Sequence, residues 1–217
     1  MSAPLRFAFD YISPYAYIAW TLVHDVAAKH DRQVEPLPVL FAGLLNAHGQ
    51  KGPAEIPAKR MYVFKDAARK ARRAGLPPLV PPPTHPFLPL LALRVSSLDL
   101  EPTARKRLIS ALFSATWAGR GGAETPAQVA AAVRSAGLEP DDLLSRAVLP
   151  ETKQRLRDQT DGAIAEGVFG VPTVIADGEL FWGVDGLESL DEFLAGRDPI
   201  SNASLLQWAD LEASATR

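Results

Sequence analysis

Strand patterns occupy the two ends of the chain, and a long helical pattern separates them. Near the N-terminus, "LRFAFDYI" (5–12) and "QVEPLPVLF" (33–41) carry the aromatic and branched residues typical of buried strands. Between them an amphipathic helix starts at Ser13-Pro14 and runs to about residue 30. If this helix is a crossover connection, the two strands are parallel neighbours in one sheet.

The last third of the chain predicts the rest of that sheet. The segment "VPTVIADGELFWGVDG" (171–186) has the pattern of two short strands joined by an Asp-Gly turn, and a helix over about 186–195 follows. The order is therefore β-α-β, a helical block of more than a hundred residues, then β-β-α. It predicts an α/β protein with a thioredoxin-like core, residues 1–42 and 161–217, and a large all-helical insertion, residues 43–160.

Prolines and helical spacing organise the insertion. Residues 42–57 have no regular pattern, and the seven prolines within 76–89 predict an extended, stiff spacer, because proline blocks both helices and central strands. The tail "ASLLQWADLEA" predicts one more helix. The other helices are expected over about 58–74, 88–98, 102–118, 126–136, 140–147 and 151–166.

Composition excludes several functional classes. The formal net charge is -2, so no overall attraction to nucleic acid or a membrane surface follows, and the basic run 65–73 is interpreted as a solvated helix face. We expect no membrane span and no signal peptide, hence a cytoplasmic protein, because no window of about 18 apolar residues and no basic leader are present. The four histidines have no metal-ligand spacing, so no metal is assigned.

The junction Ser13-Pro14 follows the first strand, at the place where a thiol oxidoreductase has Cys-Pro-x-Cys. The chain contains no cysteine, which excludes disulfides, thiolate zinc sites and redox chemistry on the protein itself. One interpretation is that Ser13 only caps the helix, with Pro14 as its first residue. The other is that its hydroxyl activates the sulfur of a bound thiol.

A second junction supports the catalytic interpretation. Val171-Pro172 precedes the third strand, where thioredoxin-like proteins have a cis-proline that faces the active turn. We therefore predict that this bond is cis and that it lies next to Ser13.

Four segments together resemble a known family. "FAFDYISPYAYIAW", "GQKGPAEIPAKRMYVFKDAARKARRAGLP", "ALFSATWAGRG" and "GVFGVPTVIADGELFWGVDGLESL" are similar to the 2-hydroxychromene-2-carboxylate isomerase family, close kin of the kappa-class glutathione transferases. The resemblance extends to about Leu190. It implies a DsbA-like thioredoxin fold, a homodimer, and a bound glutathione whose sulfur sits at Ser13.

The resemblance also implies glutathione contacts. Lys59 matches a lysine able to meet a glutathione carboxylate, although a surface charge is the alternative. Asp185 matches an acid that holds the γ-glutamyl ammonium, although it could instead cap the last helix. Trp182 lies beside the site, and the backbone of Val171 and Pro172 can pair with an extended thiol peptide. Gln50 stands where the family has Asn.

Departures and pocket residues complete the comparison. Gly186 stands where the family has Arg, so a guanidinium fork for a carboxylate is missing. Tyr15 and Phe41 can line a pocket for the second substrate, although aromatic residues at such positions are more often part of the core.

Three functions follow from these observations. The first is glutathione-dependent cis-trans isomerisation of 2-hydroxychromene-2-carboxylate or a related small aromatic breakdown intermediate. The second is a kappa-like transferase that uses the same thiolate but releases a conjugate. The third is a non-enzymatic thioredoxin-like module that binds thiols or peptides, which the residues at positions 50 and 186 favour.

Overall fold

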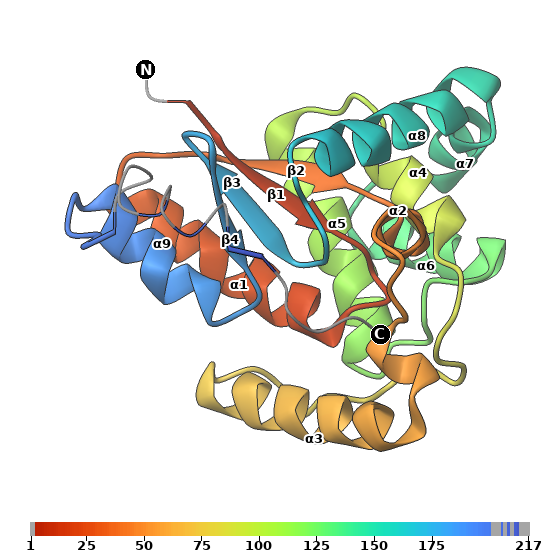
Figure 1. Ribbon diagram of the computed structural model, residues 1–217. Coiled ribbons are helices and arrows are strands. Elements are labelled where there is room, and N and C mark those ends of the chain that lie inside the picture. The colour runs from red at the N-terminus through yellow and green to blue at the C-terminus, as the bar shows by residue number, and fades with distance from the viewer. Residues whose placement is uncertain (1–2, 201–204, 206–207, 209–210, 213–217) are drawn as a thin grey trace.

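A four-stranded sheet built from both ends of the chain forms the centre of the computed structural model, which describes residues 3–200, 205, 208 and 211–212. The strand order is β2-β1-β3-β4. Strand β1 (Leu5–Phe9) is parallel to β2 (Val34–Pro38) and antiparallel to β3 (Thr173–Ala176), which pairs with β4 (Glu179–Trp182). Strands that are distant in sequence thus lie side by side, as predicted (Figure 1).

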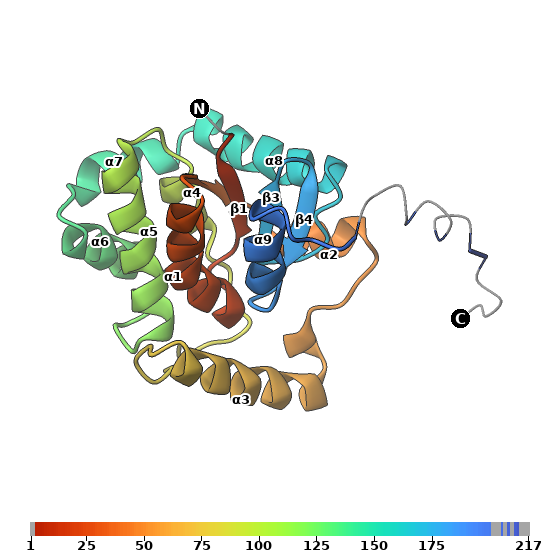
Figure 2. The same cartoon turned by 90° about the vertical axis from the view of Figure 1, so that its left-hand side faces the viewer.

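Helices cover both faces of the sheet. Helices α1 (Pro14–Lys29) and α9 (Gly186–Leu194) pack on one face, and α2 (Phe41–Ala47) and α8 (Pro150–Ala165) lie on the other (Figures 1 and 2). Alternation along β1 explains this division, because side chains point alternately to the two faces. Phe7 belongs to the core under α1, whereas Ala8 belongs to the core under α8.

The remaining helices come from the block between β2 and β3. Helix α3 stands apart from the others along the lower side of the molecule in Figure 1. Proline is the first residue of most of these helices, which suits its fixed φ and its missing N–H. The elements are η1 (Pro53–Glu55), α3 (Pro57–Arg73), α4 (Leu90–Ser96), α5 (Pro102–Trp117), α6 (Pro126–Ser135) and α7 (Pro140–Ala147).

Several sequence expectations need adjustment. Residues 42–57 are not wholly irregular, because α2 and η1 lie there. The expected domain boundary between residues 160 and 161 falls inside α8. The tail helix expected from "ASLLQWADLEA" lies mostly outside the described residues. Among the described residues, no strand of the sheet comes from 43–160, and no helix has the length and apolar character needed to cross a membrane.

The block and the sheet share one core. Phe113 of α5 packs against Phe9 and Tyr11 at ring-centroid distances of 5.4 and 4.7 Å. Both sides of this contact belong to the same buried cluster. The helical block therefore presses directly on the end of β1, where the Ser13 turn begins.

Candidate active site

Ser13 caps α1 as its sequence signal predicts. Its Oγ accepts a hydrogen bond from the Ala16 N–H at 3.2 Å, and its carbonyl accepts one from the Tyr17 N–H at 3.3 Å. Pro14 has no N–H, so among the described residues the Tyr15 N–H is the first-turn donor left for a ligand. Ser13 is 9% exposed. The helix thus presents a hydroxyl and a backbone donor at the positive end of its dipole.

The loop before β3 meets this turn. The Val171–Pro172 peptide bond is cis, and the Ser13 hydroxyl donates to the Val171 carbonyl over 3.4 Å. Two residues 158 positions apart in sequence are therefore in contact. Because 3.4 Å is long for an O–H donor, this hydrogen bond is weak and the hydroxyl can turn to a stronger acceptor.

Asp10 fixes the conformation of the turn through three hydrogen bonds. Its carboxylate accepts from the Ile12 N–H at 3.0 Å and the Phe41 N–H at 2.9 Å, and its carbonyl accepts from the Ser13 N–H at 3.1 Å. Burial raises the pKa of this carboxyl to about 6, although the hydrogen bonds oppose the shift. Asp10 was not among the site residues predicted from the sequence. Its signal is an acid that ends an otherwise apolar strand.

Two donors from the helical block bind the carbonyls of the same turn. The His85 Nε2 lies 3.0 Å from the Ile12 carbonyl, and the Trp117 Nε1 donates to the Tyr11 carbonyl at 2.8 Å. Burial lowers the pKa of His85, so its neutral ring donates through Nε2. The proline-rich segment, which contains His85, is thus more than a spacer, because it positions the loop that carries Ser13.

A chain of charged and polar side chains runs beside the turn. The Tyr15 hydroxyl donates to Asp66 at 2.8 Å, and Lys70 on the same helix pairs with Asp185 at 2.5 and 2.7 Å. Burial raises the pKa of the Tyr15 phenol, and the carboxylates of Asp66 and Asp185 raise it further. Through Tyr15 and Asp66, the Lys70–Asp185 pair is thus linked to the first turn of α1. Lys70 belongs to the run interpreted as a solvated face, but its side chain is only 16% exposed.

The other expected site residues are arranged differently. Trp182 is 56% exposed and packs against Phe169 with the two rings tilted and their centroids 5.4 Å apart. Gln50 and Lys59 are exposed, and neither has a hydrogen bond to Ser13 within the described chain. Asp185 occupies the N-cap of α9 without a side-chain hydrogen bond to it. Asp185 is therefore the N-cap residue by position only, because its carboxylate contacts Lys70 rather than the first turn of α9.

Gly186 is confined by backbone. A Cβ at this position would lie 3.0 Å from the carbonyl carbon of Phe181. The missing arginine therefore cannot be restored here without moving β4 or α9.

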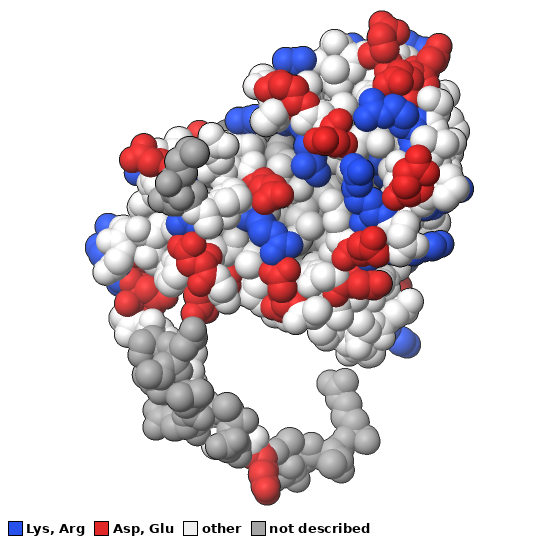
Figure 3. All heavy atoms as spheres, turned by 90° about the horizontal axis from the view of Figure 1, so that it is seen from above, with Lys and Arg blue, Asp and Glu red and all other residues white. Residues whose placement is uncertain are grey.

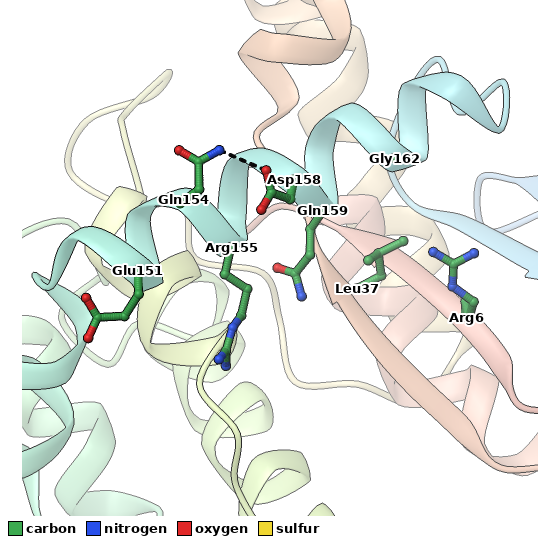
Figure 4. Close-up of a pocket in the computed structure, with 8 residues that line it drawn as sticks. All are labelled: Arg6, Leu37, Glu151, Gln154, Arg155, Asp158, Gln159 and Gly162. Carbon is green, nitrogen blue, oxygen red and sulfur yellow. Dashed lines mark hydrogen bonds between the residues drawn. The ribbon is translucent and has the colours of Figure 1, made fainter.

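A cavity of about 540 Å³ lies away from this turn, between α8 and the edge of the sheet (Figure 4). Arg6 and Leu37 come from the strands, and Arg155 and Gln159 come from α8. Seen from above, basic and acidic side chains are interspersed on this face (Figure 3). None of the expected site residues lines the cavity.

Comparisons with known proteins agree with this architecture. Glutathione S-transferase kappa 2 of Caenorhabditis elegans is 30% identical over 210 residues, covering 88% of this chain and 91% of the relative. A 2-hydroxychromene-2-carboxylate isomerase of Sphingobium xenophagum is 25% identical over 197 residues, covering 89% and 99%. A solved structure of selenomethionine 2-hydroxychromene-2-carboxylate isomerase (HCCA isomerase) superposes with a TM-score of 0.78 at 24% identity, covering 96% of this chain and 99% of that one.

A family model described as "DSBA-like thioredoxin domain" matches residues 5–195. This range begins at β1 and extends beyond the end of α9, so it contains the whole sheet and the helical block as well as the Ser13 turn. The chain belongs to the family of DSBA-like thioredoxin domain proteins.

Proposed function

We propose that this protein is a glutathione-dependent isomerase that acts on 2-hydroxychromene-2-carboxylate or a related intermediate of aromatic breakdown. The observation that carries the proposal is the position of the Ser13 hydroxyl, at a helix N-terminus and against the Val171 carbonyl, in a chain without cysteine. Such a site has no thiol of its own, and it is built to hold the thiolate of another molecule.

The physical chemistry of this turn favours a thiolate. A charge-assisted hydrogen bond from Ser13 is worth about 1.5–3 kcal/mol, and the helix dipole adds about 0.3–1 kcal/mol. Each preference of about 1.36 kcal/mol for the charged form lowers a pKa by about one unit. Together these effects lower an ordinary thiol pKa of about 8.5 by about one to three units, which brings it to the neutral range or below.

The surrounding residues fit glutathione in most respects. The Asp185 carboxylate can accept the γ-glutamyl ammonium, and the backbone at Val171 can pair with the cysteinyl unit. Lys59 is exposed on the first turn of α3 and available to a carboxylate, as is the amide of Gln50. The departure is Gly186, which offers no guanidinium.

Glutathione, when bound, supplies a thiolate that adds reversibly to a conjugated carbon and is eliminated again, so that a double bond can rotate. Ser13 holds the sulfur in its charged form before addition and after elimination. The Tyr15 N–H supplies a second donor at the same place. Asp10, His85 and Trp117 keep the turn in position, which preserves the alignment of these donors.

A kappa-like transferase is the second candidate, because the relative at 30% identity is named as one. The two functions share the activated thiol and differ in the product. Incubation with the isomerase substrate and with an electrophilic aromatic halide separates them, since isomerisation leaves glutathione unconsumed and transfer releases a conjugate.

A homodimer, as the resemblance implies, is part of the proposal.

Substitution of Ser13 tests the central claim. Ser13→Ala removes the hydroxyl but leaves the dipole and the Tyr15 N–H, so the pKa of bound glutathione should rise by about one to two units. Turnover should fall more than affinity. The pKa is measured from the ultraviolet absorbance of the thiolate during a pH titration of each complex.

A matched control is Thr125→Ala. Thr125 also caps a helix, because its Oγ accepts from the Gln128 N–H at 3.3 Å, but it belongs to α6. This variant should lose stability without changing the thiol pKa. The proposal fails if wild-type protein binds glutathione with an unshifted thiol pKa, or if Ser13→Ala behaves like Thr125→Ala.

A further inference from the structure

Lys70 and Asp185 form an ion pair that is open on one side only. The Lys70 ammonium lies 2.5 and 2.7 Å from the two carboxylate oxygens of Asp185. The Asp185 side chain is 84% exposed, whereas that of Lys70 is 16% exposed. A ligand arriving from solvent therefore meets the carboxylate first, with the ammonium directly behind it.

Lys70 is held in this place from the other side. The Asp66 carboxylate, one helical turn earlier, lies 4.0 Å from the Lys70 ammonium and accepts a hydrogen bond from the Tyr15 hydroxyl. Tyr15 is two residues from Ser13 and lies in the first turn of α1. The pair is thus anchored to the same helix end that presents the Ser13 hydroxyl.

Position 186 cannot supply a cation to this region. Gly186 has no side chain, and a Cβ there would lie 3.0 Å from the backbone of Phe181. Among the described residues, Lys70 is the cation that contacts Asp185. Lys70 belongs to α3, which is distant in sequence from the β4–α9 turn but lies beside it at this ion pair.

We propose that Lys70 and Asp185 together bind the α-amino acid end of the γ-glutamyl group, with Asp185 taking the ammonium and Lys70 taking the α-carboxylate. This inference rests on the proposed function and deepens it. In this arrangement the ligand ammonium lies against the Asp185 carboxylate and the ligand α-carboxylate lies against the Lys70 ammonium. The four charges then alternate in sign, so each charge has neighbours of opposite sign. Lys70 thereby replaces the missing guanidinium as a point charge rather than a fork.

Two glutathione analogues test the assignment one charge at a time. 4-Aminobutyryl-Cys-Gly lacks the α-carboxylate, and glutaryl-Cys-Gly lacks the ammonium. Wild-type protein should bind each analogue about 10- to 100-fold more weakly than glutathione, the ratio expected for a lost charge-assisted hydrogen bond. The measured quantity is the Kd of the analogue divided by the Kd of glutathione for the same protein. In Lys70→Met this ratio should fall toward one for 4-aminobutyryl-Cys-Gly but remain large for glutaryl-Cys-Gly. Asp185→Asn should give the reverse pattern.

The controls separate recognition from folding. Lys70→Arg keeps the cation and should keep the wild-type ratios. Lys65→Met removes an exposed lysine of the same helix and should also leave them unchanged. Calorimetric titration gives all the affinities. If glutathione binds to wild type and Lys70→Met retains the wild-type ratio for 4-aminobutyryl-Cys-Gly, Lys70 does not contact the carboxylate and this inference is overturned alone. If glutathione does not bind to wild type, the proposed function falls and the inference with it.

Discussion

Asp10 is the buried acid nearest to the Ser13 turn, and its protonation is linked to folding. Burial raises its pKa from 3.8 to about 6, against the hydrogen bonds from Ile12 and Phe41. Because the folded protein binds the proton more tightly than the unfolded chain, the stabilising contribution is fully present below a pH of about 3.8 and is lost as the pH rises through about 6.

We therefore expect a pH-dependent difference between wild type and Asp10→Asn, whose amide does not titrate. The free energy of unfolding of wild type minus that of the variant should decrease by about 3 kcal/mol as the pH rises across the two pKa values. Urea unfolding over this pH range measures the difference. A difference that stays constant with pH would show that Asp10 has an ordinary pKa in the folded protein.

Gly186 and Gly162 form a matched pair of helical glycines. A Cβ at Gly186 would lie 3.0 Å from the backbone of Phe181, whereas a Cβ at Gly162 meets no atom within 4 Å. Gly186→Ala should lower the free energy of unfolding by about 1–3 kcal/mol through overpacking. Gly162→Ala should raise it by about 0.5–1 kcal/mol, because alanine loses less backbone entropy in a helix. Equal stabilities in urea would contradict the close approach at Gly186.

The residues that could be predicted from the sequence are those with local signals. Ser13 is identified by the proline that follows it, and Pro172 by its position before a strand. Other site residues contribute through contacts with distant segments, which their sequence neighbours do not reveal. From the sequence alone, Asp10 looks like the end of a strand, His85 like a loop residue and Lys70 like a surface charge. Gln50 and Lys59 came from resemblance, and the exposed positions of both leave their roles as proposals.

At the scale of elements, the helices that begin with proline were predicted within a few residues of their observed starts. Proline fixes φ and marks the first turn, so the sequence contains the boundary. Helix α2 was missed because it has only 7 residues, no side-chain cap at Leu40 and a glycine at position 43. Its stability comes from contact with α8. There the Thr160 hydroxyl oxygen accepts a hydrogen bond from the N–H of Leu40, the N-cap residue of α2, at 3.0 Å.

The proline-rich connection between α3 and α4 gives a prediction at this scale. His85 in this connection makes edge-to-face contacts with the rings of Phe64 and Trp117, and its Nε2 donates to the Ile12 carbonyl. His85→Phe keeps an aromatic ring but removes the donor, so the free energy of unfolding at a neutral pH should fall by about 1–3 kcal/mol. The glutathione-dependent turnover of the isomerase substrate should also fall, because the turn that carries Ser13 loses a hydrogen bond that positions it.

The pH dependence of this effect gives an independent check. Burial lowers the pKa of His85 below 6.5, so its contribution to stability is present above pH 6.5 and is lost as the pH falls below that value. The stability gap between wild type and His85→Phe should therefore narrow in acid. His24, whose pKa burial lowers to about 4, is present in both proteins and cancels in the comparison. A gap that widens in acid would mean that the charged form of His85 makes the contact.

At the scale of the whole molecule, the helical block is an insertion in the sequence order, but it has no separate hydrophobic core among the described residues. The cluster that contains Phe7 and Phe9 of β1 also contains Leu112 and Phe113 of α5. Helix α8 crosses the expected boundary without a break and contacts both β2 and α2. We therefore propose that the sheet and the helical block unfold together as one cooperative unit, although the sequence order divides them.

Phe113→Ala tests this cooperativity from inside the block. Phe113 is fully buried and contacts aromatic rings of β1 and α1, so the variant should lose about 3–5 kcal/mol of stability. Val148→Ala removes a half-exposed side chain of the same block and should change stability by less than about 0.5 kcal/mol. Far-ultraviolet circular dichroism follows the helices, and fluorescence follows the four tryptophans of the chain, of which Trp20 and Trp117 are buried where α1 meets the block. In one cooperative unit both signals change at the same urea concentration, in wild type and in Phe113→Ala alike. Two separate transitions in either signal would instead identify the block as a separate folding domain, because the loss of Phe113 would then unfold the insertion at a lower urea concentration than the sheet.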